Sequence, residues 1–255
     1  GIRLHNSTLV FIDDHLDRLY ASANGIDLKI SYTKNDIINE INKVLNKNNM
    51  DHDVHIRLII SRGDKITPYQ NPNANVGPIN LVIIPEYKKT DPITYKLGVK
   101  IGRVPNIRPN EHILSPNYNT LSKLNCILAS IEANKLGYDE GIMNDLNGNI
   151  STCNSTNLFF VKNNEIFTST GEYCLNGITR SKAIKICSEN KIKCHQINFT
   201  YDDIKDCDEA FVTGTFAGII PVSELENRKL KSIHPDSAVN HIRLLYNNHI
   251  KKNIS

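Results

Sequence analysis

Two short glycine-containing stretches carry residue types that bind phosphate groups, and the first is LNGITR at 175–180. It places Gly177, Ile178 and Thr179 immediately before a helical pattern. Free backbone N–H groups and a hydroxyl at the positive end of a helix favour an anion. The stretch alone leaves one alternative open, which is that Thr179 only caps the helix.

The second stretch is VTGTFAG at 212–218, a glycine-flanked turn with the hydroxyls of Thr213 and Thr215. Arg18 adds a guanidinium that could pair with the same anion, because arginine presents a rigid fork of N–H donors. Taken alone, Arg18 is more typical of a solvent-facing helix residue than of an anion site. The chemistry that these residues share is recognition of a phosphate-bearing cofactor.

The elements that must position these residues form a mixed α/β pattern in the second part of the chain. Apolar residues at helical spacing predict a helix from about Thr120 to Leu136, which Gly137 ends. Two apolar runs around Asn163 and Asn164 predict a β-hairpin. The remaining pattern predicts a strand near 97–104, a helix from about Thr179, strands near 195–199, 209–213 and 218–223, and a helix near 236–248.

Helix and strand also alternate in the first 86 residues. Asp13 and Asp14 favour the start of a helix that carries Arg18, and Thr33 is a suitable N-cap for a second helix. The rest of this part predicts strands over 54–60 and 80–85, joined by a loop over 62–78.

The polar segment from Tyr87 to Pro92 is the predicted boundary between two domains. Its composition changes abruptly, and Pro92 resists continued regular structure. We therefore expect a small α/β domain over residues 1–90 and a larger, β-rich domain with helices over residues 93–255.

Composition excludes several classes of protein. The chain has 255 residues with 30 Lys and Arg against 27 Asp and Glu, a net charge of +3, which gives no basic footprint for nucleic acid. Its apolar runs are far shorter than the roughly 20 residues of a membrane span. The six cysteines lack zinc or disulfide-scaffold spacing, which favours reduced thiols and a cytoplasmic location.

Taken in order, several stretches of the chain resemble the class IV aminotransferases, the fold-type-IV enzymes that use pyridoxal 5′-phosphate. This family includes branched-chain and D-amino-acid aminotransferases and aminodeoxychorismate lyase. The resemblance is carried by GIRLHNSTLVFIDDHLDRLYASA (1–23), IRLIISRG (56–63), LNCILASIEANKLGYDEGIM (124–143), NGNISTCNSTNLFFVKNNEIFTS (147–169), LNGITR (175–180) and EAFVTGTFAGIIPV (209–222).

The resemblance implies a two-domain, fold-type-IV architecture, a homodimer, and amino-group transfer between an amino acid and a 2-oxo acid. It also implies that the small domain lacks its first strands here. The residues that it implies for binding the cofactor phosphate are Arg18, Gly177, Ile178, Thr179, Gly214 and Thr215. A dianionic phosphate is well matched by one fixed cation and several N–H and O–H donors.

Two positions depart from the pattern of the family. The lysine that holds the cofactor covalently and moves the substrate proton aligns with Asn119, which has no nucleophilic amine. Lys123 is the nearest substitute, although it also fits an ordinary solvated lysine. The glutamate that keeps the pyridine nitrogen protonated aligns with Thr152, whose hydroxyl cannot act as an anionic partner.

Two functions therefore stay open at this point. The first is a pyridoxal-phosphate aminotransferase that uses Lys123. The second is a divergent relative that binds pyridoxal phosphate, or another phosphorylated ligand, without a covalent bond. A lyase-like activity is a further alternative. The sequence names no metal ligands, and it predicts neither a nucleic acid nor a membrane as a partner.

Overall fold

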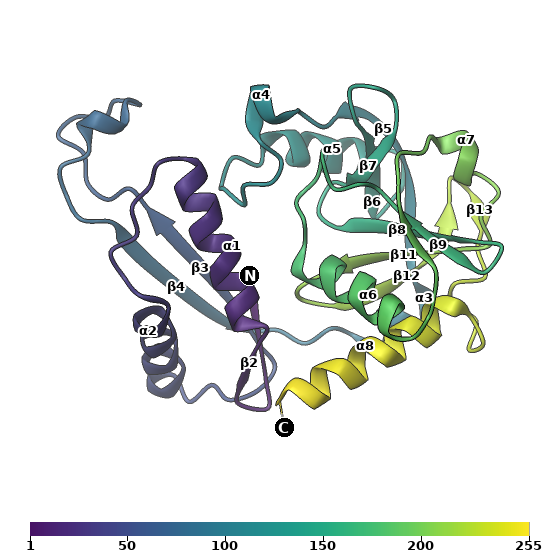
Figure 1. Cartoon of the computed structure of the whole chain (residues 1–255), viewed down its shortest axis with the longest axis horizontal. Helices are drawn as coiled ribbons and strands as arrows, with labels where there is room; N and C mark the ends of the chain where they lie inside the picture. The colour runs from purple at the N-terminus through teal and green to yellow at the C-terminus, as the bar shows by residue number, and fades with distance from the viewer. Residues whose placement is uncertain (255) are drawn as a thin grey trace. The chain divides into compact units, whose positions relative to one another are not determined.

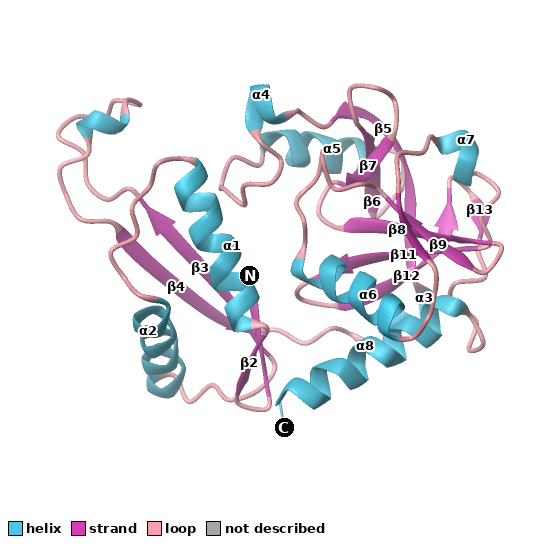
Figure 2. Cartoon of the chain, viewed as in Figure 1, coloured by secondary structure: helices cyan, strands magenta, loops and turns pink. Residues whose placement is uncertain are grey.

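The computed structural model describes residues 1–254 and the side chains of residues 1–252. The chain forms two compact units, Gly1–Lys89 and Thr90–Asn253. Helices and strands occur in both units (Figures 1 and 2), so the predicted mixed α/β fold is confirmed. Among the described helices, none is long and apolar enough to cross a membrane.

The first unit contains four strands and two α-helices. They are β1 (Ile2–His5), β2 (Thr8–Val10), α1 (Ile12–Gly25), α2 (Lys34–Lys47), β3 (Val54–Ser61) and β4 (Asn80–Tyr87), with a short 3₁₀ helix at Pro72–Ala74. The strands form an antiparallel sheet in the order β2-β1-β3-β4.

Local sequence signals explain why α2 begins and packs where it does. The Thr33 side chain accepts a hydrogen bond from the backbone N–H of Asp36, and the Asp36 carboxylate accepts one from the Thr33 N–H, which is a capping box. Ile37, Ile41 and Leu45 then recur on one face and are buried. They pack in one cluster with residues of α1 and of β1 and β3, so both helices cover the same face of the sheet (Figure 1).

The second unit is richer in strands. Its helices are α3 (Pro92–Leu97), α4 (Glu111–Leu114), α5 (Leu124–Lys135), α6 (Ile178–Glu189), α7 (Tyr201–Ile204) and α8 (Ala238–Ile254). Its strands are β5 (Val99–Ile107), β6 (Glu140–Asn144), β7 (Ile150–Cys153), β8 (Asn157–Lys162), β9 (Glu165–Thr168), β10 (Cys194–Gln196), β11 (Glu209–Gly214), β12 (Gly218–Leu225) and β13 (Arg228–Lys229).

The strands of this unit join in the order β10-β9-β8-β11-β12-β5-β6-β7, with β13 paired to β12. The predicted hairpin is β8–β9, and Asn163 and Asn164 at its turn both have positive φ, as a two-residue hairpin turn requires. The ring of Phe159 on β8 stacks on that of Phe211 on β11, with ring centres 4.6 Å apart. The centre of the sheet is therefore anchored by aromatic packing between β8 and β11.

Helix α5 begins later than predicted, and its large apolar side chains are not the ones that it buries. It begins at Leu124 rather than near Thr120, because Lys123 occupies the cap position with φ −112° and ψ 8°. Its buried residues are the small Ala129 and Ala133, while the large apolar side chains are turned outward. Those exposed side chains, here called the α5 apolar face, belong to Leu124, Ile127, Leu128 and Ile131.

Candidate functional site

The N-terminus of α6 supplies backbone donors for an anion. Gly177 is the N-cap and has no side chain to cap the helix, so the first helical N–H groups are left for another partner. Ile178 and Thr179 follow and are buried, at 9% and 4% exposure. The helix continues for 12 residues, long enough for its dipole to reinforce the positive end.

Asn157, at the start of β8, fixes the position of this helix end. Its side-chain amide donates to the carbonyl of Leu175 at 2.9 Å, in the loop that enters α6. A Cβ atom added at Gly177 would lie 2.4 Å from the Asn157 Oδ1 atom. Position 177 thus lies against β8, and a larger residue there would have to displace the Asn157 side chain or the loop.

The turn after β11 reaches the same place through strand pairing. Thr213 pairs with Asn157 in the antiparallel register of β11 and β8, and Gly214 ends the strand. A Cβ atom added at Gly214 would lie 3.7 Å from the Thr156 Cγ2 atom. Gly177 and Gly214, which are 37 positions apart in the sequence, therefore both lie against residues 156–157.

An unpaired hydroxyl lies at the end of β11. Within the described part of the chain, the buried Thr213 Oγ1 atom has no hydrogen-bond partner. A buried polar atom without a partner costs free energy, so such a group commonly serves a ligand or an ordered water. Thr215, two residues further on, is half-buried in the turn. Together with the α6 N-terminus, this donor set fits a phosphate group.

Thr152 on β7 is bound to the same turn. Its Oγ1 atom donates a hydrogen bond to the carbonyl of Thr156 at 2.7 Å. Since the hydroxyl proton is engaged there, the oxygen lone pairs are what Thr152 offers to a further group. Thr152, Gly177 and Gly214 are therefore brought together around residues 156–157.

Glu140 is a charged residue of this region that the sequence analysis did not single out. Its carboxylate accepts hydrogen bonds from the Ser155 hydroxyl and from the Thr156 hydroxyl, the latter at 2.9 Å, and a longer one from the Ser155 N–H at 3.3 Å. Burial raises the pKa of Glu140, and these donated hydrogen bonds offset part of that rise. Glu140 therefore holds the 154–157 turn that Thr152 and Gly214 contact.

This raised pKa has a consequence for stability. A carboxyl group with a raised pKa binds its proton more tightly in the folded chain, so its contribution to stability is present below its ordinary pKa and is lost as pH rises through the raised value. Because Glu140→Gln cannot ionise, we expect the free energy of unfolding of the unmodified chain to fall relative to that of the variant as pH rises from the ordinary carboxyl pKa through the raised value.

Urea unfolding at several pH values measures this difference. The exposed Glu172 is the control, and Glu172→Gln should show no such divergence over the same window. A gap between the unmodified chain and Glu140→Gln that stays constant with pH would contradict the assignment to Glu140.

Asn119 and Lys123 lie in the segment before α5, and both side chains are exposed. The Lys123 Nζ atom donates to the Asn119 Oδ1 atom at 3.2 Å. Nearby in the same segment, the Asn117 side chain accepts a hydrogen bond from the Asn176 amide at 3.1 Å. Since Asn176 precedes Gly177, this segment lies beside the N-terminus of α6.

Arg108 is a second residue that the sequence analysis missed. It is buried at 9% exposure and donates to the Tyr173 carbonyl, the Asn125 side chain and the Cys126 sulfur. It thereby ties the first turn of α5 to the loop that leads into α6. No local pattern marks it, because it directly follows β5 among prolines and asparagines, at residues 105–106 and 109–110.

Arg18 belongs to the first unit, where it is half-buried on α1. Burial lowers its pKa, yet a guanidinium stays charged at neutral pH. Its part in binding a phosphate stays a prediction, whereas the other predicted binding residues share the second unit.

Comparison with known proteins decides the family. The profile described as amino-transferase class IV matches residues 1–225, which is most of the chain. This chain belongs to the class IV amino-transferases.

Named relatives agree with this membership. This class IV amino-transferase is 32% identical over 233 residues to a putative branched-chain-amino-acid aminotransferase of Methanocaldococcus jannaschii, a match that covers 91% of this chain and 79% of that protein. It is 30% identical over 230 residues to branched-chain-amino-acid aminotransferase-like protein 2 of Arabidopsis thaliana. That match covers 89% of this chain but 41% of the plant protein, so this chain spans less than half of it.

Solved structures show the same fold. The T.th. branched-chain amino acid aminotransferase, complexed with N-(5′-phosphopyridoxyl)-L-glutamate, has a TM-score of 0.88 at 23% identity, covering 98% of this class IV amino-transferase and 83% of that chain. The branched-chain aminotransferase from Thermoproteus uzoniensis with norvaline has a TM-score of 0.86 at 25% identity, with 98% and 83% covered. The predicted fold-type-IV architecture is thereby confirmed.

Proposed function

We propose that this class IV amino-transferase binds pyridoxal 5′-phosphate in its second unit. The observation that carries the proposal is the meeting of the α6 N-terminus and the β11–β12 turn against residues 156–157. The residues of the second unit that would hold the phosphate are Gly177, Ile178, Thr179, Gly214 and Thr215, while the part of Arg18, which lies in the first unit, stays a prediction from the resemblance. This set combines N–H donors and hydroxyls at the positive end of a helix, as a phosphate group requires.

The reaction that we propose is amino-group transfer between an amino acid and a 2-oxo acid. Branched-chain amino acids are the first substrates to test, because the similar proteins of Methanocaldococcus jannaschii and Thermoproteus uzoniensis carry that name. When bound, the cofactor supplies an electron sink for the charge left on the substrate Cα atom.

Lys123 is the residue that we assign to covalent attachment and proton transfer. Asn119 has no amine at the position where the family has its lysine, but the Lys123 amine lies 3.2 Å from the Asn119 Oδ1 atom. An amine is thus available within one hydrogen bond of the expected place. Lys123 would hold the cofactor and carry the proton to and from the substrate Cα atom.

Thr152 makes the proposed reaction slow. Its oxygen can accept a hydrogen bond from a pyridinium N–H, because its own proton is given to the Thr156 carbonyl. A neutral hydroxyl stabilises that cation less than a carboxylate does, so the ring withdraws electrons less strongly. The second candidate function, non-covalent binding of pyridoxal 5′-phosphate without turnover, is favoured by the same two residues, Asn119 and Thr152.

Chemical trapping separates the two functions. The chain is incubated with pyridoxal 5′-phosphate, reduced with borohydride, digested and mapped by mass spectrometry. The proposal expects the label on Lys123, with its loss in Lys123→Arg and its retention in Lys135→Arg, which changes an exposed lysine at the far end of α5. If the chain binds pyridoxal 5′-phosphate but Lys123 carries no label, the first function is contradicted and the non-covalent function is supported.

A homodimer and a cytoplasmic location complete the proposal. The α5 apolar face exposes 66% of Leu124, 52% of Ile127, 45% of Leu128 and 43% of Ile131. A contiguous apolar patch of this kind typically marks a protein interface, and we assign it to a second copy of this chain. The cytoplasmic location stays a prediction from the sequence.

The double variant Leu128→Glu with Ile131→Glu tests the dimer. Two charges in an apolar interface cannot be hydrated or paired, so we expect the chain to change from dimer to monomer in sedimentation or light scattering. Leu244→Glu is the matched control, since Leu244 on α8 is 51% exposed and lies outside this face. A dimer that persists in the double variant would contradict the assignment.

A further inference from the structure

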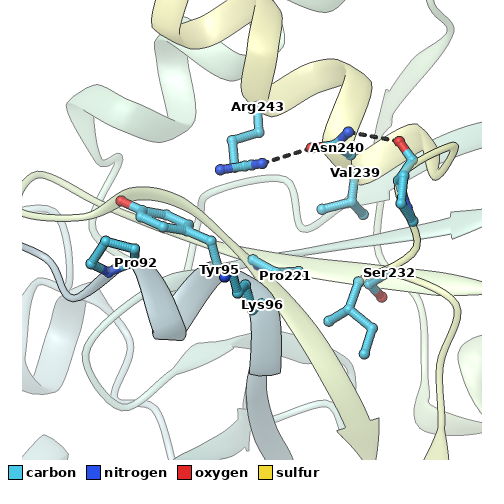
Figure 3. A pocket seen from close by; sticks show the side chains of 10 residues that line it. Pro92, Tyr95, Lys96, Pro221, Ser232, Val239, Asn240 and Arg243 are labelled. Carbon is cyan, nitrogen blue, oxygen red and sulfur yellow. Dashed lines mark hydrogen bonds between the residues drawn. The ribbon is translucent and has the colours of Figure 1, made fainter.

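A cavity of about 400 Å³ lies within the second unit, and none of its lining residues is among those assigned to the phosphate. It is formed by α3, the start of α8, Pro221 of β12, and the loop that precedes α8 (Figure 3). Its volume falls within the range of pockets that bind small molecules, which is about 300–1,000 Å³.

The walls of this cavity are mostly apolar. Pro92, Pro221, Ile233 and Val239 contribute rings and branched side chains to its lining. Flat or branched carbon groups fit such walls, because they replace water at little cost. The body of a ligand that fills the cavity is therefore apolar.

Two cationic side chains line the cavity. The guanidinium of Arg243, on α8, lies over the ring of Tyr95, on α3, at 5.0 Å from the ring centre (Figure 3). The amine-bearing side chain of Lys96 also lines the cavity and is exposed. None of the described lining residues is acidic, so the positive charge of the lining favours an anion.

The side chains of Arg243 and Tyr95 are both held in place by hydrogen bonds. The Arg243 Nη2 atom donates to the Asn240 Oδ1 atom at 2.7 Å, and the Asn240 amide in turn donates to the Pro235 carbonyl at 2.6 Å (Figure 3). The Tyr95 hydroxyl donates to the Ala217 carbonyl at 2.8 Å. A guanidinium that is fixed at one edge presents its remaining N–H groups with little loss of entropy on binding.

We propose that this cavity binds a small carboxylic acid with a flat or branched apolar body. Its carboxylate is held by Arg243 and attracted by Lys96, and its carbon body lies against the proline-lined wall. A single fixed guanidinium matches a monoanion. A phosphate would instead require the cluster of N–H donors found at the start of α6.

Calorimetric titration of the full chain with 3-phenylpropionate tests the proposal, with 3-phenylpropanamide as the uncharged probe of the same shape. We expect the carboxylate to bind saturably, and the amide to bind at least about tenfold more weakly, because a charge-assisted hydrogen bond is lost. Arg243→Gln should weaken carboxylate binding by at least about tenfold for the same reason.

Lys96→Glu provides a second variant, because Lys96 is exposed and its replacement leaves the packing intact. It should weaken binding by about fivefold through repulsion of the carboxylate. Lys229→Gln is the control, as Lys229 is exposed on β13 and does not line the cavity. Thr215→Val reports on the turn after β11, and it should leave 3-phenylpropionate binding unchanged.

Three results would overturn the proposal. They are equal binding of acid and amide, binding that both Arg243→Gln and Lys96→Glu leave unchanged, and binding that Thr215→Val abolishes. The last result would place 3-phenylpropionate at the phosphate residues instead of in this cavity.

Discussion

Replacing Asn119 by lysine and Thr152 by glutamate is expected to raise the rate of amino-group transfer by at least about 10³-fold, the scale of a positioned general acid or base together with a charged partner. Asn119→Lys places an amine at the position where the resemblance puts the covalent lysine. The existing Lys123 amine would lie close to it, and like charges lower each other's pKa, which leaves more of the new amine in its nucleophilic form.

Thr152→Glu supplies the second missing charge. A carboxylate there would pair with a protonated pyridine nitrogen, which the Thr152 hydroxyl can only meet as a neutral acceptor. We expect each single variant to gain less than the pair, since attachment and electron withdrawal serve the same step. Transfer from leucine to 2-oxoglutarate with added pyridoxal 5′-phosphate measures the rate.

Asn134→Lys is the matched control for this gain. It adds the same amine at a different exposed asparagine, which lies on α5, and it should leave the rate unchanged. If the double variant binds pyridoxal 5′-phosphate and still shows no gain, the alignment of positions 119 and 152 with the family residues is wrong.

Gly177→Ala is expected to weaken the binding of pyridoxal 5′-phosphate by about 100-fold and to destabilise the fold by about 1–3 kcal/mol, the usual cost of overpacking. The added Cβ atom would lie 2.4 Å from the Asn157 Oδ1 atom, so one of the two groups must move. Asn157 is held by its bond to the Leu175 carbonyl, and shifting it displaces the loop that aims the α6 N–H groups.

Gly214→Ala is the control, because it replaces a glycine of the same site without introducing a steric clash. Its Cβ atom would meet the Thr156 Cγ2 atom at an ordinary 3.7 Å, so its thermal unfolding should match that of the unmodified chain. If Gly177→Ala and Gly214→Ala are equally stable and Gly177→Ala binds the cofactor as tightly as the unmodified chain, the assignment of phosphate binding to the α6 N-terminus is contradicted.

The sequence predicts α2 well because its signals are local. Thr33 and Asp36 form the cap within one turn, and the buried Ile37, Ile41 and Leu45 follow at helical spacing. The hairpin of β1 and β2 was missed, since strands of four and three residues are too short to show a period. An element is thus predictable from the sequence when it has both an N-cap and a long apolar periodicity.

Helix α5 shows where periodicity fails. The spacing of Leu124, Leu128 and Ile131 predicts an apolar face, but it does not distinguish a core from an interface. In the structure the small Ala129 and Ala133 face inward and the large residues face outward. That choice depends on how closely α5 approaches the sheet, which no local window encodes.

The candidate site is also only partly predictable from the sequence. The stretches at 175–180 and 212–218 predict phosphate chemistry from residue type alone. Their meeting point at residues 156–157 is made by the pairing of β8 with β11, which are distant in sequence. Glu140 reaches that turn from β6, so its role is visible only once the strands are placed.

The phosphate dependence of binding tests the central claim most directly. Pyridoxal 5′-phosphate and pyridoxal differ only in the phosphate group, and their dissociation constants can be compared in the unmodified chain and in Thr179→Val with Thr215→Val. We predict that the phosphate tightens binding at least about 100-fold in the unmodified chain and about tenfold or less in the double variant, in line with the loss of two hydrogen bonds to a charged group. Equal affinities for the two compounds in the unmodified chain would contradict the account.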